Sequence, residues 1–389
     1  MRMISAIACE FDPDKLIADL TSQITTGMEA TPIDLLLVFV SIPLQKHFVQ
    51  IISELKQKTG ARLIMGSTAE SVLGGELEIE RQAGVSAMAM SIPGVTVDHF
   101  HFADEEWPEI LGETKTMRNR LEAGLDLRLF IMMGDPFTTP VVQLLDMCSQ
   151  EFPNAPVVGG MASGIDRPGE TRLAVNDDIF SSGLIGVSFA GPLNVDCVVS
   201  QGCRPIGPVY DITAGHDNVI EQLNHKPAMS MVRDMMGHIS AQERRLVEQR
   251  GLQIGRVIDS RKDTFGRGDF LVRNILGIHR PTGSLSIGDM VHSGQIIQFH
   301  VQDAETADED LKLLLQGELL LTERPRGALM FSCNGRGTNL FGAAHHDIQL
   351  VRESLGPIPV AGFFCAGELG PVGGRNFIHG QTVSLALFH

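Results

Sequence analysis

The sequence has few basic residues for its length. Its 31 lysines and arginines stand against 47 aspartates and glutamates, which gives the 389 residues a formal net charge of −16. Binding to nucleic acid or to an anionic membrane requires a basic surface that neutralises phosphate. The pairs Arg244-Arg245 and Arg261-Lys262 are isolated. The composition therefore argues against nucleic acid and membrane surfaces as partners.

Long hydrophobic runs and paired cysteines are also missing. No apolar stretch approaches the roughly 20 residues that span a bilayer. The N-terminal run Met1–Cys9 is too short for a secretory signal. The six cysteines include no Cys-x-x-Cys pair and are too sparse for a disulfide scaffold. We therefore expect reduced thiols in a cytoplasmic protein.

The common catalytic signatures do not occur either. No Walker loop, dinucleotide fingerprint or Ser-His-Asp order stands out. The only histidine clusters are His345-His346, which Asp347 follows, and His99-x-His101. Adjacent histidines on a helix point about 100° apart, and the second cluster has no third ligand at a recognisable spacing. The sequence thus predicts neither a metal nor a cofactor.

What the sequence does contain is a pattern that occurs three times. A hydrophobic strand enters a polar turn, a helix follows, a second strand ends in small residues, and a later strand carries Val-Ser. Such self-similarity indicates a repeated supersecondary unit. The units comprise Leu35–Val40, Arg62–Gly66 and Val85-Ser86; Leu129–Met133, Val157–Gly160 and Val187-Ser188; and Leu329–Phe331, Val360–Phe364 and Val383-Ser384.

The pattern predicts an α/β fold of mixed α+β character. Three strand-helix-strand-strand units would form mixed sheets, and short strands between Leu252 and Asp303 would form an antiparallel meander in the C-terminal half. We expect a helix from about Asn218 to Met236 that Pro227 breaks or kinks. A chain of this length also favours two domains, with a boundary near residues 225–250.

Caps mark several other helices. Ser41 and Pro43 are expected to open the helix of the first unit, and Gly60 to end it. Asp135 is expected to cap the second unit's helix, and Thr306 is a candidate cap for a helix that runs to Leu321.

Several segments, taken in order, resemble the FIST proteins. The resemblance runs from about residue 30 to the C-terminus and is most specific in the third unit. The segments are Gly66-Ser67-Thr68-Ala69-Glu70, Gly159-Gly160-Met161-Ala162-Ser163, Ser200–Gly207, Phe270–Gly277, Phe331-Ser332-Cys333-Asn334-Gly335-Arg336-Gly337 and Gly362-Phe363-Phe364-Cys365-Ala366-Gly367-Glu368-Leu369-Gly370-Pro371.

The resemblance implies a sensory or signal-transduction protein with a FIST N-like domain over residues 1–235 and a FIST C-like domain over residues 236–389. It implies a small ligand, such as an amino acid, and a downstream signalling protein as partners.

The turn after the strand Leu329–Phe331 is the first candidate for ligand binding. Its residues are Ser332, Cys333, Asn334, Gly335 and Arg336. Glycines let the backbone approach a bound group, exposed N–H groups hold anions, and arginine grips a carboxylate with two hydrogen bonds. The alternative is a tight turn in which Arg336 pairs with a surface acid.

Glu368 follows the next strand and would receive the ammonium group of a zwitterionic ligand. The alternative is that it neutralises Arg336 or caps the turn. The other candidate ligand-binding residues are Ser67, Glu70, Ser163, Cys203, Arg204 and Cys365.

The cysteines leave a second function open. Arg204 would lower the pKa of the neighbouring Cys203 thiol, and Cys333 and Cys365 could approach one another at the ends of two strands. Buried structural cysteines are the alternative. The main prediction is a small-ligand sensor that binds at the carboxyl ends of strands. A thiol- or carboxylate-dependent enzyme and a protein-interaction scaffold are the alternatives.

Overall fold

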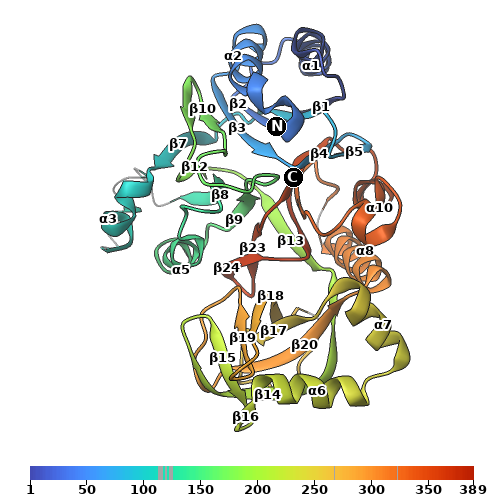
Figure 1. Ribbon diagram of the computed structural model, residues 1–389. Helices are drawn as coiled ribbons and strands as arrows, with labels where there is room; N and C mark the ends of the chain where they lie inside the picture. The colour runs from blue at the N-terminus through green and yellow to red at the C-terminus, as the bar shows by residue number, and fades with distance from the viewer. Residues whose placement is uncertain (113–116, 119–120, 122–125, 267, 322) are drawn as a thin grey trace. The chain divides into compact units, whose positions relative to one another are not determined.

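The computed structural model describes residues 1–112, 117–118, 121, 126–266, 268–321 and 323–389 (Figure 1). The chain divides into two compact units. The larger unit contains residues 1–199, 312–378 and 382–389, and the smaller unit contains residues 200–311 and 379–381. The domains 1–235 and 236–389 remain a prediction, because compactness in space and family domains along the sequence are different divisions of a chain.

The described residues of the larger unit form three six-stranded sheets. The first contains β1 (Arg2–Ala8), β6 (Val85–Ser91), β2 (Leu35–Ser41), β3 (Leu63–Ala69), β10 (Leu173–Val175) and β11 (Asp178–Phe180). The second contains β7 (Thr96–Phe102), β12 (Leu184–Ala190), β8 (Leu127–Gly134), β9 (Val157–Met161), β23 (Glu368–Val372) and β24 (Arg375–His379). The third contains β13 (Val195–Gln201), β25 (Thr382–Phe388), β21 (Gly327–Cys333), β22 (Val360–Cys365), β4 (Ser71–Gly74) and β5 (Leu77–Glu80).

Each of these sheets has one parallel pair at its centre. The pairs are β2/β3, β8/β9 and β21/β22, and the strands on either side of each pair run antiparallel to it. The strand beyond the second parallel strand comes from a distant part of the chain: β10 pairs with β3, β23 with β9, and β4 with β22. The sheets are therefore mixed, as the sequence predicts. This pairing between distant parts of the chain also places β23, which begins at Glu368, beside β9.

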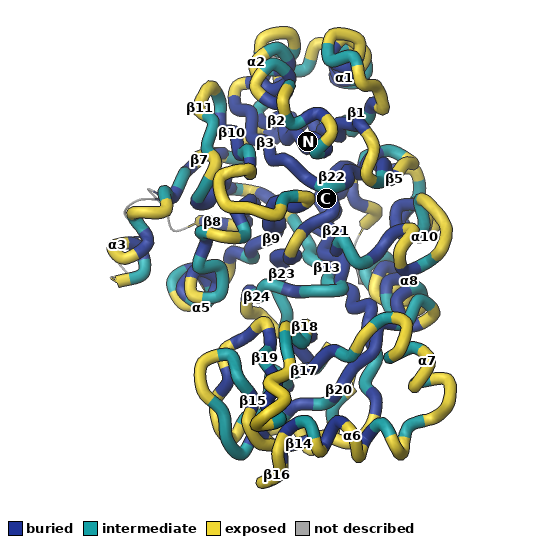
Figure 2. Tube along the Cα trace, viewed as in Figure 1, coloured by how far each residue is buried: buried dark blue, intermediate teal, exposed yellow. Residues whose placement is uncertain are grey.

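The central strands are hydrophobic on both faces because both faces are buried. In β2, Leu35, Leu37 and Phe39 belong to a core to which all three sheets contribute. The alternate residues of β2 belong to a second core beneath α1 and α2. Figure 2 shows these strands as buried, while the outer faces of the helices are exposed. Strand ends at the shared core are consequently shielded from solvent.

Local residues mark the ends of several helices. Asp12 accepts hydrogen bonds from the N–H groups of Asp14 and Lys15 at the start of α1, and Gly60 ends α2 in the left-handed conformation, as predicted. The bounds are α1 (Pro13–Met28), η1 (Ile42–His47), α2 (Phe48–Thr59), η2 (Asp104–Glu106), α3 (Trp107–Gly112), α5 (Val141–Glu151), α6 (Ala228–His238), α7 (Ala241–Arg250), α8 (Ala304–Leu321), α9 (Thr338–Phe341) and α10 (His346–Leu355).

The smaller unit contains a seven-stranded sheet. Helix α6 packs against β15 and β19, and α7 packs against β20. The order is β14 (Cys203–His216), β20 (Ile296–Gln302), β17 (Gln253–Val257), β18 (Phe270–His279), β19 (Ser284–Ile287), β15 (Val219–Leu223) and β16 (Lys226–Pro227).

Three local predictions are wrong. The first half of the expected helix 218–236 is β15, which pairs with β14, and Pro227 stands immediately before α6 rather than inside a helix. Thr306 does not cap α8, because the helix begins at Ala304 and Asp303 accepts the hydrogen bond from the N–H of Glu305. Pairing across the sheet decides the first of these outcomes, and residue propensities do not report such pairing.

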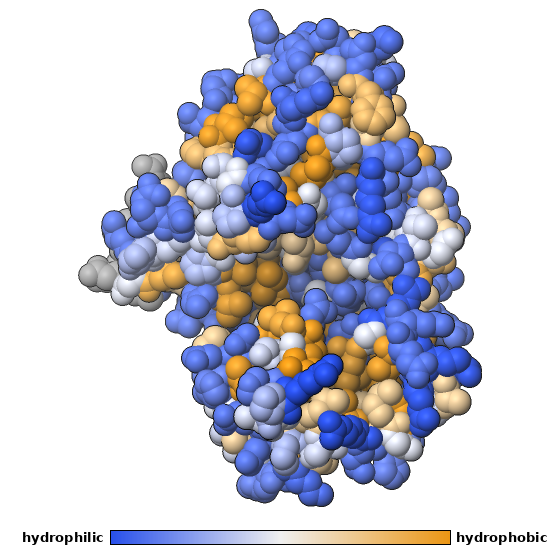
Figure 3. All heavy atoms as spheres, viewed as in Figure 1, coloured by the Kyte–Doolittle hydropathy of each residue, from blue (hydrophilic) through white to orange (hydrophobic). Residues whose placement is uncertain are grey.

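Hydrophilic residues cover most of the face shown in Figure 3, and hydrophobic residues are confined to scattered groups. Within the described residues, no helix is both long enough and apolar enough to cross a bilayer.

Candidate functional site

The turn after β21 holds the most deeply buried cation among the described residues. The N–H of Asn334 donates to the carbonyl of Cys365 at 3.1 Å, and the N–H of Arg336 donates to the carbonyl of Cys333 at 2.9 Å. The first bond ties the turn to the end of the neighbouring strand β22, and the second closes the turn onto the end of β21. Arg336 has no solvent-exposed surface. A fully buried guanidinium must find its hydrogen-bond acceptors inside the protein.

Asp347 at the start of α10 supplies two of these acceptors. Its carboxylate accepts hydrogen bonds from Nε and Nη2 of Arg336 at 2.6 and 2.8 Å. Burial alone would raise the pKa of Asp347, but the charge and hydrogen bonds of Arg336 outweigh burial and lower this pKa to about 2. Arg336 therefore pairs with an acid, as the alternative interpretation of this turn proposed. The acid is buried, however, and not at the surface.

One nitrogen of Arg336 remains without a partner. Nη1 is buried and forms no hydrogen bond with any described residue. The ring of Phe341, at the end of α9, lies 5.4 Å from the guanidinium carbon, and His346 stacks on that ring with the centroids 3.6 Å apart. The aromatic pair covers the cation but offers Nη1 no acceptor.

Glu368 is the second fully buried charged residue at these strand ends. Its Oε2 accepts hydrogen bonds from the hydroxyl of Thr382 at 2.8 Å and from the N–H of Thr382 at 3.4 Å, whereas Oε1 has no partner among the described residues. Burial raises the pKa of Glu368 to about 8, although Thr382, Cys333 and the charge of Arg336 oppose the shift. Glu368 is therefore mostly neutral at pH 7.

Glu78 on β5 is a third carboxyl at the same site, and no motif in the sequence indicated it. Its Oε1 accepts a hydrogen bond from the N–H of Ile348 at 3.0 Å, and Oε2 is buried without a partner in the described chain. Burial and the charge of Asp347 raise the pKa of Glu78 to about 8. We call Glu78, Arg336, Asp347 and Glu368 the Arg336 cluster, because each carboxyl interacts electrostatically with Arg336.

The predicted residues of the third unit surround this cluster. Cys333 and Cys365 are paired neighbours in the register of β21 and β22, and both are free thiols. The hydroxyl of Ser332 and Oδ1 of Asn334 are buried and form no hydrogen bond with the described chain. Gly335 lets its N–H approach the sulfur of Cys333 at 3.5 Å. The structure therefore places five predicted residues and Cys365 within one pair of strand ends.

Residues predicted from the first two units are held by internal hydrogen bonds. The hydroxyl of Ser163 accepts from the N–H of Glu70 at 2.9 Å and donates to the carbonyl of Phe364. Glu70 also pairs with Arg81 at 2.5 Å, and Ser67 donates to the carbonyl of Thr68 at 3.1 Å. Ser163 therefore joins the ends of β3, β9 and β22. A binding role for these three residues remains a prediction.

Cys203 and Arg204 belong to the smaller unit, whereas every other predicted site residue belongs to the larger unit. Arg204 pairs with Asp303 at 2.7 Å and with Glu243 at 3.1 Å. Cys203 is buried. The two acids neutralise the cation that was expected to activate the thiol, and a role for either residue in binding stays untested.

Asp135 follows β8 and organises the turn before α5. It accepts hydrogen bonds from the N–H groups of Phe137 and Thr138 and from the hydroxyls of Thr138 and Thr171. It caps this turn rather than α5 itself, which begins at Val141.

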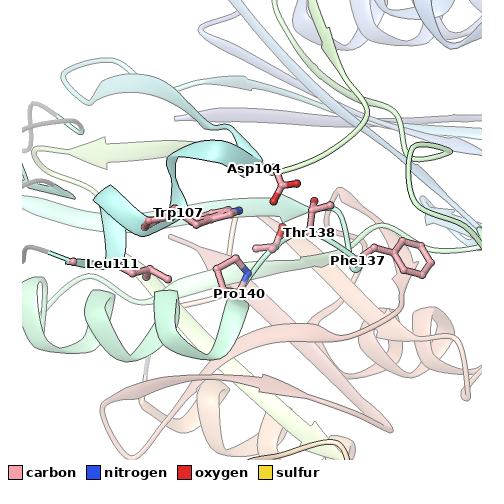
Figure 4. A pocket seen from close by; sticks show the side chains of 9 residues that line it. Asp104, Trp107, Leu111, Phe137, Thr138 and Pro140 are labelled. Atoms are coloured by element: carbon pink, nitrogen blue, oxygen red, sulfur yellow. The ribbon is translucent and has the colours of Figure 1, made fainter.

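A pocket that the sequence did not predict lies beside this turn. Its volume is about 680 Å³, and Figure 4 shows Trp107 and Leu111 of α3 opposite Phe137, Thr138 and Pro140. The buried Nε1 of Trp107 has no hydrogen-bond partner among the described residues. None of the predicted ligand-binding residues is among the described residues that line this pocket.

In the described part of the chain, no group of three or more His, Cys, Asp or Glu side chains is placed so that it could hold a metal ion. His345 instead accepts a hydrogen bond at Nδ1 from the N–H of Glu78 at 2.8 Å.

Comparison with known sequences identifies two family domains. The FIST N domain matches residues 34–226 and the FIST C domain matches residues 228–371. An uncharacterized protein of Mycobacterium tuberculosis is 37% identical over 341 residues, which cover 87% of each chain. An uncharacterized protein of Mycobacterium bovis is 38% identical over 344 residues, which cover 87% of this chain and 86% of the relative.

Two weaker similarities accompany these matches. The alpha subunit of an ADP-forming succinate–CoA ligase from Aquifex aeolicus is 29% identical over 189 residues, which cover 46% of this chain and 55% of that protein. A crystal structure of a cyanuric acid hydrolase from A. caulinodans aligns over 100% of this chain and 99% of that chain at 10% identity, with a TM-score of 0.35. That score is too low to indicate a shared fold.

Proposed function

Since the chain belongs to the FIST family, whose domains are associated with sensory signal transduction, we propose that it is a cytoplasmic sensor of an amino acid or another small carboxylate. The ligand binds at the carboxyl ends of β21 and β22, between Arg336 and Glu368. One observation carries this proposal: Nη1 of Arg336 and Oε1 of Glu368 are both buried and both lack a hydrogen-bond partner in the described chain.

Unsatisfied buried polar groups are rare because each one costs about 1–3 kcal/mol, and more when it is charged. A ligand carboxylate would accept hydrogen bonds from Nη1 of Arg336, whose other nitrogens already bind Asp347. A ligand ammonium group would donate to Oε1 of Glu368. The two orphaned atoms thus complement the two ends of an amino acid.

Access to the cluster requires α9 to move, because Phe341 covers the guanidinium. This four-residue helix is held by Glu80, whose Oε1 accepts hydrogen bonds from the N–H of Thr338 at 2.8 Å and from its hydroxyl at 2.6 Å. Ligand binding would change the position of α9, and a downstream signalling protein would recognise that change.

The state of the cysteines supports a sensor over a thiol-dependent enzyme. All six are free, which fits a reducing compartment. Burial and the nearby charges of Glu368 and Cys333 raise the pKa of Cys365 well above its usual range, so this side chain stays a weakly nucleophilic thiol.

A thermal-shift screen of the twenty amino acids and simple carboxylates tests the proposal. A ligand at about one hundred times its Kd stabilises the folded state by about 2.7 kcal/mol and raises the Tm. The double variant Arg336→Met/Asp347→Leu removes the buried pair without leaving a lone charge, so it should fold and lose the shift. Arg81→Gln, whose arginine lies outside the cluster, is the control. A shift that survives in the double variant would refute the site.

A further inference from the structure

The smaller unit contains two adjoining pockets that the proposed sensor site does not use. One, of about 370 Å³, lies among α6, α7, β18 and β19. The other, of about 570 Å³, lies at the end of β18 and beside α6. Met229 and Ile278 line both pockets, so the two spaces meet at these side chains. Their volumes fall in the range of about 300–1,000 Å³ that is typical of ligand sites.

The first pocket is apolar. We call it the apolar pocket, and the described side chains that line it away from the junction are Val232, Met236, Val247, Leu252, Ile275 and Leu285. None of them carries a hydrogen-bonding group in its side chain. Met229 and Met236 have flexible, polarizable thioethers that adapt to the shape of an apolar ligand. This pocket is suited to a hydrocarbon chain.

The second pocket, here called the basic pocket, carries Arg233 from α6 and Arg280 from the end of β18. No acidic residue is among its described lining residues. Both arginines are exposed, and neither forms an ion pair or a hydrogen bond with a described residue. In a chain with a net charge of −16, two unpaired guanidinium groups in one pocket favour an anion, and their planar donor sets match a carboxylate.

We propose that the two pockets together bind a single-chain anionic amphiphile of the fatty-acid type. The hydrocarbon chain occupies the apolar pocket, passes between Met229 and Ile278, and the carboxylate binds Arg233 and Arg280. Burial of the chain provides most of the affinity, because each CH₂ group removed from water contributes about 0.8 kcal/mol. The arginines select a negative head group.

Isothermal titration calorimetry of the full chain with monomeric sodium decanoate tests this proposal. Decanoate should bind, and decyltrimethylammonium and acetate should not, because the first has the wrong charge and the second lacks the chain. The variant Arg233→Gln/Arg280→Gln should weaken decanoate binding at least about tenfold. Its matched control is Arg245→Gln, which removes an exposed arginine of α7 that lines neither pocket.

A second pair of variants tests the apolar pocket. Ile278 is 51% exposed and Leu276, two residues earlier on β18, is 64% exposed, but only Ile278 lines the pockets. Ile278→Glu should abolish decanoate binding, while Leu276→Glu should change it by no more than about twofold. Circular dichroism verifies that both variants fold.

Three results would overturn the proposal. The first is equal binding of decanoate and decyltrimethylammonium, and the second is full affinity in the double arginine variant. The third is co-sedimentation with phosphatidylglycerol vesicles without any binding of decanoate. That result would mean that the apolar and basic pockets contact a lipid surface instead of binding a single amphiphile.

Discussion

The turns after β8 and β21 both follow a buried parallel strand, but they treat their charged residues differently. Asp135, after β8, uses both carboxylate oxygens for hydrogen bonds to the turn and to Thr171. Arg336, after β21, binds Asp347 and leaves Nη1 without a partner. In the turn after β8, the charged side chain forms hydrogen bonds through both of its oxygens. In the turn after β21, one buried N–H donor group of the charged side chain has no hydrogen-bond partner among the described residues.

This difference separates a structural cap from a candidate binding site. Both residues are fully buried, so burial alone does not distinguish them. The distinction lies in whether every donor and acceptor has a partner, because a satisfied group has little left to offer a ligand. Substitutions in the two turns should therefore have different effects on stability and on ligand binding.

Asp347→Ala should have the largest effect on stability. It leaves Arg336 buried without its bidentate partner and should lower the free energy of unfolding by about 3–5 kcal/mol. Urea denaturation measures this loss. Asp177→Ala is the control, since Asp177 pairs with Lys56 at 2.9 Å and its side chain is 82% exposed. That pair should contribute no more than about 1 kcal/mol. Equal losses in the two variants would contradict the importance of the buried pair.

Asp135→Ala should destabilise the protein by about 1–3 kcal/mol, because the donors of the turn lose their acceptor. Ligand-induced stabilisation in the thermal-shift screen should persist in this variant, once its lower Tm is taken as the baseline. If the variant folds and no ligand stabilises it, the turn after β8 contributes to binding as well, and the comparison between the turns fails.

The pH dependence of unfolding should show the raised pKa of Glu368, about 8. The unfolded carboxyl ionises near its model value of 4.5, so between these pKa values only the folded state holds the proton. The stability due to this proton is fully present below pH 4.5 and is lost as the pH rises through about 8.

Glu368→Gln removes this titration. The wild-type free energy of unfolding should fall more steeply with pH than that of the variant, by up to about 1.4 kcal/mol per pH unit. Glu78, which also has a pKa of about 8, contributes the same slope to both proteins. Parallel curves from pH 5 to pH 8 would show that Glu368 is not held neutral.

Arg81→Gln should have the smallest effect. Arg81 pairs with Glu70 after β3, but its side chain is 70% exposed. Loss of this pair should change the free energy of unfolding by less than about 1 kcal/mol in a urea titration. A larger loss would mean that the turn of the first unit is as strongly coupled as that of the third.

The sequence predicted the mixed sheets because their central strands are short hydrophobic runs bounded by turn residues. It also indicated Arg336 and Glu368, since both follow such runs in glycine-rich segments. It did not predict Glu78 as a member of the cluster, because β4 pairs with β22 across a long separation in sequence and β5, which carries Glu78, pairs with β4. Nor did it predict that Asp347 binds Arg336, because that contact depends on how α10 packs.

The most direct test is the number of protons released when the protein binds the amino acid that gives the largest thermal shift. An ammonium group beside Oε1 would favour the ionised form of Glu368, which is mostly protonated at pH 7. Calorimetry at pH 7 in buffers of different ionisation enthalpy should show release of nearly one proton in the wild type and none in Glu368→Gln. Binding without proton release, or equal release in both proteins, would contradict a ligand between Arg336 and Glu368.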